Sequence, residues 1–410
     1  MAKRILIAAG LTGGHIMPGV ALAEGLSRIL PDTSFLFVGA GRPAEGKILD
    51  PLGYQRATIQ ASGIKGRGPF GKLGAAIGAF RGFFKALGIL RSFKPDLVFA
   101  TGGYVSGPVG LAAFVKGIPL VIHEQNRRPG LTNRLLSKIA REVFLGDAKG
   151  GRYFPKGKAT FTGNPVRESI LALGDREGHQ RREAEGITLL VLGGSQGARG
   201  VNRALLGIIP SMAKAGTKIR VIHQAGAEGE KELLGPYESS GLDFELKDFF
   251  QDMPRVLGEA DLAISRAGAL TLAELRAAGL PAVLVPLPTA ADDHQTENAM
   301  SFVEAGCGIL APEADIAADK AEGKASVGSG LWGILEPLIS EPSKLSAMRE
   351  AYRKLPAASS GLGMAERIKE RLLSARKGAK KEEAGEPENP KEKAGGEPDA
   401  SEPGTKDPAA

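Results

Sequence analysis

The feature that most constrains this chain is a repeated alternation of short apolar runs with helical stretches. The first series of runs covers residues 4–9, 34–38, 96–100, 119–123 and 142–145. A second series starts beyond Gly163-Asn164-Pro165 and covers residues 187–192, 218–223, 243–246, 261–265 and 282–286. Strands that alternate with helices are typical of βαβ units. The sequence therefore predicts two similar α/β domains, each built on a parallel sheet.

The domain boundaries follow from this pattern. We expect the first domain to occupy residues 1–163 and the second to occupy residues 164–343. The periodicity of residues 344–376 predicts C-terminal helices that pack back toward the first domain. Residues 377–410 contain no Val, Leu, Ile, Met or aromatic residue, and Glu, Pro, Gly and Lys dominate. Such a segment cannot form a core, so we expect a disordered tail.

Composition excludes several classes of protein. Cys307 is the single cysteine, so an intramolecular disulfide cannot form. Lys3 and Arg4 lead into an apolar run that is too short for a signal peptide. The longest apolar segment, residues 109–122, is broken by Lys116 and Pro119 and is too short to span a bilayer. We therefore expect a cytoplasmic protein whose contact with a membrane would be peripheral.

The segment between Asp50 and Asp96 contains eight basic residues and no acidic one. An apolar stripe with intervals of 3 and 4 runs through it, with cations interspersed; the residues are Phe70, Leu73, Ile77, Phe80, Phe84 and Leu87, with Lys72, Arg81 and Lys85. A helix of this kind fits a surface that rests on anionic lipid. A stripe packed into the protein core is the alternative interpretation.

Each half opens with a strand that leads into a glycine cluster and then a helix. The clusters are Gly10-Leu11-Thr12-Gly13-Gly14-His15 and Gly193-Gly194-Ser195-Gln196-Gly197. Glycine lets backbone N–H groups and a positive helix end approach a phosphate, which predicts a nucleotide ligand. Neither cluster has the dinucleotide spacing with its ribose-binding acid, nor the P-loop pattern, which disfavours NAD, FAD and ATP. Glycines that serve only tight packing are the alternative.

A denser group of polar residues lies in the second half. Thr271 and Glu274 follow the run at 261–265, where a carboxylate near a helix start suits the hydroxyls of a ribose. A capping box formed by the same two residues is the alternative interpretation. Residues 292–298 carry acid, imidazole and amide groups and follow another predicted strand. Such groups can hydrogen-bond the hydroxyls of a sugar, and an ordinary polar helix start is the alternative interpretation.

Six motifs, in their order and spacing, resemble the MurG family. They are residues 12–15 (TGGH), 101–108 (TGGYVSGP), 123–126 (HEQN), 163–167 (GNPVR), 193–199 (GGSQGAR) and 266–274 (RAGALTLAE). The resemblance spans about residues 3–375. It implies the GT-B fold, with two Rossmann-like doubly wound parallel-sheet domains facing a cleft. It also implies an inverting transferase that moves GlcNAc from UDP-GlcNAc to the muramyl C4 hydroxyl of lipid I, giving lipid II in peptidoglycan synthesis.

The resemblance implies roles for the matching residues. The uracil would lie beside the backbone near Phe250, and the ribose on Glu274. The diphosphate would lie on Ser195, Gln196, Leu270 and Thr271. His294 and Gln295 would hold the GlcNAc hydroxyls, with Asn126 and Arg167 reaching from the other side. Thr12, Gly13 and Gly14 would bind UDP-GlcNAc from a loop that also faces the lipid I diphosphate, and Gly103, Tyr104 and Ser106 would contact the acceptor.

The reaction requires a base for the acceptor hydroxyl and hydrogen-bond donors for the diphosphate leaving group. His15, at a helix start that favours a neutral imidazole, is the candidate base, and a structural hydrogen bond is its alternative role. Glu124 competes for the role of base. The sequence contains no Asp-x-Asp metal motif, so we expect no metal and no other cofactor. Leu11 stands where the family pattern has Gly, which puts the shape of this loop in question.

The expected partners are UDP-GlcNAc, lipid I (undecaprenyl-diphosphoryl-MurNAc-pentapeptide), anionic membrane lipids, and the cell-wall and division machinery. The expected location is the cytoplasmic face of the plasma membrane, with a role in cell shape, cell division and the cell cycle. Two other functions stay open: a GT-B lipid glycosyltransferase with a diacylglycerol acceptor, and a catalytically silent UDP-sugar-binding scaffold. A nucleic-acid binder is disfavoured because the basic segment lacks stacking aromatics in a recognisable module.

Overall fold

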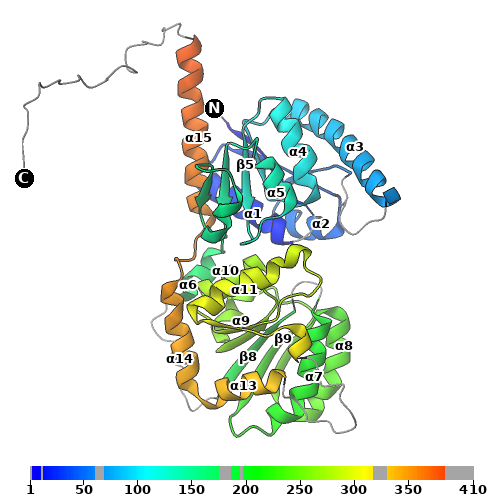
Figure 1. Ribbon diagram of the computed structural model, residues 1–410, viewed down its shortest axis with the longest axis vertical. Coiled ribbons are helices and arrows are strands. Elements are labelled where there is room, and N and C mark those ends of the chain that lie inside the picture. Colours follow the sequence, from blue (N-terminus) through cyan, green and yellow to red (C-terminus); the bar gives the residue numbers. More distant parts are fainter. Residues whose placement is uncertain are drawn as a thin grey trace, which may run out of the picture. The chain divides into compact units, whose positions relative to one another are not determined.

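The computed structural model describes residues 2–10, 13–60, 69–174, 186–193, 197–316 and 330–383 (Figure 1). The chain forms two compact units, Met1–Lys369 and Glu370–Ala410. Both sheets of the described residues belong to the first unit. Within the described chain, no helix is both long and apolar enough to cross a membrane.

The first sheet is formed by the first series of apolar runs. Its described strands pair in parallel in the order β3-β2-β1-β4-β5-β6-β7. Their bounds are β1 (Arg4–Ala8), β2 (Ser34–Gly39), β3 (Gln55–Thr58), β4 (Leu97–Ala100), β5 (Leu120–Glu124), β6 (Glu142–Leu145) and β7 (Ala159–Phe161). The accompanying helices are α1 (Gly13–Ile29), α2 (Pro43–Leu49), α3 (Pro69–Phe93), α4 (Gly103–Val115), α5 (Leu131–Leu136) and the 3₁₀ turn η1 (Ala148–Tyr153).

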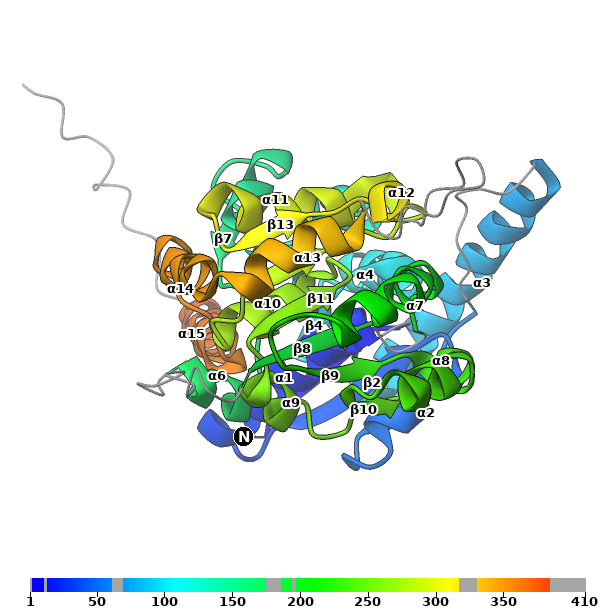
Figure 2. The same cartoon turned by 90° about the horizontal axis from the view of Figure 1, so that it is seen from below.

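The second sheet repeats this arrangement, in the order β10-β9-β8-β11-β12-β13 (Figure 2). Its strands are β8 (Ile187–Leu192), β9 (Ile219–Gln224), β10 (Asp243–Lys247), β11 (Leu262–Ser265), β12 (Ala282–Leu284) and β13 (Gly308–Leu310). The helices are α6 (Glu168–Gly174), α7 (Arg199–Ala213), α8 (Gly226–Ser240), α9 (Met253–Glu259), α10 (Ala269–Ala277), α11 (His294–Ala305), α12 (Glu313–Ile316) and α13 (Leu331–Ser340), with the 3₁₀ turn η3 (Ala291–Asp293). The prediction of two doubly wound parallel sheets is therefore confirmed.

Burial explains why the strands read as nearly continuous apolar runs. A parallel sheet covered by helices on both faces hides every side chain of its central strands, so alternation with polar residues disappears. Ile5, Leu6 and Ile7 of β1 have no exposed surface. Leu189 and Leu190 of β8 are equally buried at the centre of the second sheet.

Each predicted run forms a strand whose ends lie within one or two residues of the predicted ends. The structure adds β3, β7 and β13, which the apolar pattern does not reveal. These strands have four, three and three residues and lie at the edges of their sheets. Short edge strands contribute little to a core, so their residues need not be apolar.

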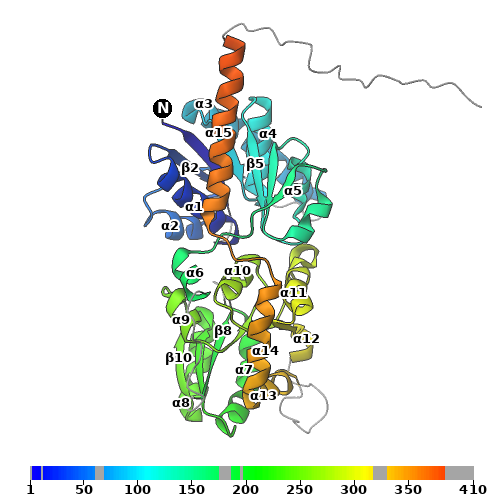
Figure 3. The ribbon, with the colours of Figure 1, turned by 90° about the vertical axis from the view of Figure 1, so that its left-hand side faces the viewer.

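The chain returns from the second half to the first through α14 (Pro342–Ala351), a 3₁₀ turn at Tyr352–Lys354 and α15 (Gly361–Glu383). The start of α15 lies against α1, where a Cβ on Gly25 would be 3.0 Å from the Cβ of Ala365 (Figure 3). Arg367 of α15 pairs with Glu142 at 3.0 Å. The helix extends past residue 377, where the predicted tail begins, because Lys, Ala and Glu favour helix. Residues 384–410 of that tail lie outside the described residues.

Candidate functional site

The predicted site residues lie just after the carboxyl ends of strands. In each sheet these strands are next to the topological switch point, where the strand order reverses direction. In the first sheet this point lies between β1 and β4, and in the second between β8 and β11. Doubly wound sheets bind ligands outside the carboxyl ends of their strands at such a point. The described residues of the two glycine clusters, and the residues after β4 and β11, therefore occupy the positions where a ligand is expected.

His15 lies in the first turn of α1, and its Nδ1 is 2.9 Å from the carbonyl oxygen of Thr101. A carbonyl oxygen only accepts hydrogen bonds, so Nδ1 donates and Nε2 keeps its lone pair. Burial lowers the pKa of His15, the hydrogen bond to Thr101 opposes this shift, and His294 of the second half lowers the pKa further. A neutral imidazole with an unprotonated Nε2 is what a general base requires.

The loop beside His15 depends on two glycines. Gly102 has φ 95° and Gly103 has φ 74°, a region that glycine occupies without strain. A Cβ on Gly102 would lie 3.4 Å from Cε1 of His15, so the loop passes directly against the imidazole. Ser106, a predicted acceptor contact, is fully buried, and its Oγ accepts from the Gly102 N–H at 3.1 Å. We therefore assign Ser106 to shaping this loop, while the neighbouring Tyr104 is 44% exposed.

Glu124 is buried at the end of β5, and both carboxylate oxygens accept hydrogen bonds. Oε1 accepts from the N–H and Nδ2 of Asn126 at 3.0 and 3.1 Å. Oε2 accepts from the Gly130 N–H at 3.1 Å and from Asn133 Nδ2 at 2.9 Å. Burial raises the pKa of Glu124, and these hydrogen bonds oppose the rise. Because its oxygens are occupied by its own loop, Glu124 is suited to holding Asn126 in place and poorly suited to proton abstraction.

Gln125 links His15 to a second imidazole, a contact that the sequence motif did not reveal. Its Nε2 donates to the Thr101 carbonyl at 3.0 Å and lies 3.2 Å from Nδ1 of His123. Burial lowers the pKa of His123 to about 4. The carbonyl that orients His15 is therefore itself held by a buried, neutral network.

On the second half, α10 begins directly after β11. Its N-cap is Gly268 and Thr271 is the third helical residue, so the capping-box interpretation of Thr271 and Glu274 is wrong. The backbone N–H groups of Leu270 and Thr271 lie in the first turn, where an anion is stabilised. Glu274, one turn later, pairs with Arg167 at 3.0 Å. Burial raises the pKa of Glu274, and Arg167 opposes the rise.

The turn before α11 is strained. Asp292 has φ 55° and Asp293 has φ 53°, which are left-handed values that non-glycine residues seldom adopt. The turn sets His294 and Gln295 at the start of α11, and Gln295 Oε1 accepts from the Leu287 N–H at 2.9 Å. Strain of this kind is concentrated at functional sites. Sequence reasoning missed this strained turn, because Asp before a helix is common.

Phe250 is buried in the core of the second half, and its N–H donates to Gln224 Oε1 at 3.0 Å. Its backbone is therefore fixed, as the predicted uracil position requires. Behind the second glycine cluster, His223 lies 3.2 Å from Asn202 Oδ1 and 3.1 Å from the Tyr237 hydroxyl. Burial lowers the pKa of His223 to about 3. This neutral network supports the first turn of α7, and sequence reasoning missed it.

Some predicted residues cannot be placed. Thr12, Ser195 and Gln196, predicted to contact the substrates, lie outside the described residues, as does Leu11. Gly13 and Gly14 form the start of α1. Among the described residues, no group of three or more His, Cys, Asp or Glu side chains is arranged to hold a metal ion.

Part of the apolar stripe of α3 lies on the protein surface, whereas Leu87 is half-buried and packs against the core of the first half. Ile77, Phe80 and Phe84 are 46%, 64% and 55% exposed, and Arg81 and Lys85 beside them are exposed. The opposite side of α3 packs inward through residues such as Ala86 and Leu90. The core interpretation of the stripe is therefore wrong for the three exposed residues. The side chain of Leu73 lies outside the described ones. On the neighbouring helices α4 and α5, further exposed apolar residues are Leu111, Phe114, Val115, Leu131 and Leu135.

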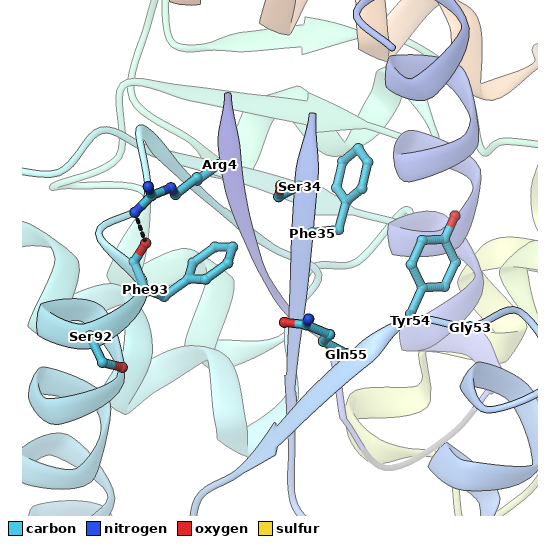
Figure 4. A pocket seen from close by; sticks show the side chains of 8 residues that line it. All are labelled: Arg4, Ser34, Phe35, Gly53, Tyr54, Gln55, Ser92 and Phe93. Carbon is cyan, nitrogen blue, oxygen red and sulfur yellow. Dashed lines mark hydrogen bonds between the residues drawn. The ribbon is translucent and has the colours of Figure 1, made fainter. Parts of the chain in front are cut away.

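A hollow of about 440 Å³ lies at the opposite edge of the first sheet, at the amino ends of β1, β2 and β3 (Figure 4). Its lining residues are Arg4, Ser34, Phe35, Gly53, Tyr54, Gln55, Ser92 and Phe93. Arg4 Nη1 donates to the Phe93 carbonyl at 3.1 Å. Because it opens at the amino ends of the strands, this hollow is separate from the site built on their carboxyl ends.

Comparison with known families matches both halves. Residues 5–145 match the glycosyltransferase family 28 N-terminal domain, and residues 188–324 match the C-terminal domain of that family. A relative from Geobacter sp. (strain M21) is 39% identical over 352 residues, covering 86% of this chain and 92% of its own length. One from Desulfotalea psychrophila is 42% identical over 319 residues, covering 77% and 85%. Both are named UDP-N-acetylglucosamine--N-acetylmuramyl-(pentapeptide) pyrophosphoryl-undecaprenol N-acetylglucosamine transferase.

Solved structures agree with this similarity. MurG from Acinetobacter baumannii is 28% identical, with a TM-score of 0.70 that covers 90% of this chain and 99% of that one. UDP-GlcNAc 2-epimerase from Neisseria meningitidis is 14% identical, with a TM-score of 0.57 that covers 91% and 100%. The second similarity concerns the fold alone.

Proposed function

The chain belongs to glycosyltransferase family 28, and from this premise we propose that it transfers N-acetylglucosamine from UDP-GlcNAc to lipid I. Lipid I is the N-acetylmuramyl-(pentapeptide) pyrophosphoryl-undecaprenol of its relatives' names, and the product, lipid II, serves peptidoglycan synthesis. Similarity over most of the chain supports the assignment of both substrates.

The second half is proposed to hold the donor. The first turn of α10 would stabilise the diphosphate, since its N–H groups lack partners within the helix. Glu274 would accept hydrogen bonds from the ribose, and Arg167 would remain close enough to neutralise charge at the same place. His294 and Gln295, set by the turn at Asp292, would contact the GlcNAc hydroxyls.

The first half is proposed to hold the acceptor and the base. Nε2 of His15 takes the proton of the muramyl C4 hydroxyl while that oxygen attacks C1 of GlcNAc, on the face opposite UDP. The bond from C1 to the phosphate oxygen breaks, its electron pair leaves with UDP, and the new bond is β. The observation that supports this assignment best is the hydrogen bond from His15 Nδ1 to the Thr101 carbonyl, which reserves Nε2 as an acceptor.

The direct test is UDP release from UDP-GlcNAc by the purified protein, with and without a lipid I analogue and in EDTA. We expect UDP and a disaccharide lipid only when the lipid I analogue is present. Diacylglycerol in its place tests the alternative acceptor. Binding of UDP-GlcNAc without release of UDP in the presence of either acceptor would support the silent scaffold and refute the transferase.

We further propose that the exposed apolar residues of α3 and α4, with Arg81 and Lys85, rest on anionic lipid. Phe80 and Phe84 are large apolar side chains in solvent, and exposed residues of this kind mark interaction surfaces. A membrane surface is where an acceptor carried on undecaprenol would be found, and a nucleotide-sugar donor supports our proposal that the enzyme works on the cytoplasmic face. Through lipid II supply the enzyme would serve cell shape, division and the cell cycle, alongside the cell-wall and division machinery.

A further inference from the structure

Helix α11 contacts the first half of the molecule beyond its predicted donor-binding end. Its Asn298 accepts a hydrogen bond from the Arg127 N–H at 3.0 Å and donates to Asn126 Oδ1 at 3.1 Å. Its Glu304 accepts from Arg127 Nη2 at 3.1 Å and from Lys149 Nζ at 2.5 Å. Asn126, Arg127 and Lys149 all belong to the first half, so one helix of the second half is held by loops of the other.

Arg127 is the central group of this contact. Its side chain is 8% exposed, and a buried guanidinium needs an opposite charge beside it. Among the described residues, Nε and Nη1 have no hydrogen-bond partner, while Glu297 Oε2 lies 3.8 Å from Nε. If α11 moved slightly closer to Arg127, Glu297 could also form an ion pair with the guanidinium that Glu304 already binds. The contact between α11 and Arg127 can therefore gain a second ion pair.

The spacing of residues along α11 connects this contact to the donor end. His294, Asn298, Ser301 and Glu304 follow intervals of 4, 3 and 3, so they share one side of the helix. All four residues belong to one helix of 12 residues, with no break between them. The contacts that Asn298 and Glu304 make with the first half therefore bear on the position of His294, which is near enough to His15 to lower the pKa of that imidazole.

We propose that Arg127 is a positioning residue for the transfer reaction: its guanidinium binds Glu304 and holds α11 so that the donor residues face the base. The bond from the Arg127 backbone N–H to Asn298 stays in place when only the side chain is replaced. This role rests on the proposed function. It assigns Arg127 no contact with either substrate.

A distance measurement tests the inference without needing turnover. Spin labels at Asp32→Cys and Lys231→Cys, two exposed positions on different halves, report the separation of the halves by pulsed electron resonance. Cys307 is fully buried and will not take up label under native conditions. We expect a narrow distance distribution in the parent, a broad one after Arg127→Ala, and an intermediate one after Arg127→Lys, which keeps a single charge for Glu304.

Kinetics provide the second readout. Misplacement of α11 by about 1 Å is expected to lower kcat by about 10- to 100-fold in Arg127→Ala. The affinity for UDP, whose proposed contacts lie within the second half, should change by less than about threefold. Arg128→Ala is the matched control, since Arg128 is exposed and no ion pair is assigned to it among the described residues. We expect parental kinetics from that variant.

Glu304→Gln guards against a folding defect. Its side chain is 40% exposed, so the variant should fold, and it removes the charge that Arg127 binds. Unchanged distances in both Arg127→Ala and Glu304→Gln, or unchanged kcat in both, would overturn the inference. If the parent releases no UDP with lipid I, the proposed function is refuted, and the distance distributions alone then decide whether Arg127 holds α11.

Discussion

Replacement of His15 by Asn separates the base from the structural hydrogen bond. The Asn Nδ2 can take the place of the imidazole Nδ1 and donate to the Thr101 carbonyl, which is 2.9 Å away in the parent. The carbonyl also accepts from Gln125, so it keeps a partner even if the new bond is poor. Asn provides no group that can accept the proton that Nε2 would take.

The two roles predict different magnitudes. A lost or weakened neutral hydrogen bond at a carbonyl that keeps another partner costs about 0.5–1.5 kcal/mol of unfolding free energy. A lost general base lowers turnover by about 10²- to 10⁴-fold. If His15 is the base, His15→Asn should lose kcat by at least about 100-fold while its unfolding free energy changes by no more than about 1.5 kcal/mol.

The assay is UDP release with a lipid I analogue, measured beside urea unfolding on the same samples. The parent's kcat/KM should fall as pH drops through an apparent pKa below 6.5, because burial lowers the pKa of His15 and protonation removes the base. Turnover in His15→Asn within tenfold of the parent would refute the assignment. Loss of both turnover and several kcal/mol of stability would instead support the structural role.

Four further outcomes are expected. Glu274→Gln should weaken UDP-GlcNAc binding by about 10- to 100-fold, measured by calorimetry, because the ribose hydroxyls lose a charged acceptor. An unchanged affinity would contradict the role of Glu274 in binding the ribose. The double variant Phe80→Ser with Arg81→Glu should lose binding to anionic vesicles in a co-sedimentation assay. The matched control, Leu234→Ser with Lys231→Glu, changes an equally exposed pair on α8 and should keep that binding. Equal vesicle binding by the two double variants would contradict the proposed membrane surface. Turnover should persist in EDTA, and a strict Mg²⁺ requirement would oppose the proposed metal-free chemistry. Because the pKa of His223 is about 3 when folded and 6.5 when unfolded, only the unfolded state takes up its proton between pH 6.5 and 5.5. The parent should therefore lose about 1 kcal/mol of unfolding free energy from this group over that pH unit, because the unfolded imidazole is already half protonated at pH 6.5. The variant His223→Gln should lose that much less in urea unfolding, and equal slopes would show that His223 is not the source.

The exposed stripe of α3 illustrates where sequence reasoning stops. Its periodicity predicted a helix with one apolar side, and the structure has that helix over Pro69–Phe93. Periodicity cannot say whether such a side faces core or solvent, because both environments accept the same residues. Only the packing of Ala86 and Leu90 against the sheet decides that Phe80 and Phe84 point outward.

Glu124 gives a second case. Its motif marked it as functional, and a carboxylate near a reacting hydroxyl is a reasonable base. The hydrogen bonds from Asn126, Gly130 and Asn133 join residues up to nine positions apart, and their convergence depends on how the loop folds. These hydrogen bonds leave Glu124 poorly suited to act as the base, and His15 stays the proposed base.

The sequence by itself determined the two doubly wound sheets and the positions of the glycine clusters, because buried strands must be apolar and tight strand-to-helix turns must contain glycine. It also determined which residue types meet at the strand ends. The tertiary structure alone decided three further features: the tautomer of His15, the strained turn at Asp292 and Asp293, and the contact between Arg127 and α11. The tautomer depends on the Thr101 carbonyl, and the Arg127 contact depends on the Glu304 carboxylate; both partners are distant in the chain, so local pattern contains no information about them. The left-handed φ angles of Asp292 and Asp293 are not marked by the residue types, because Asp before a helix is common.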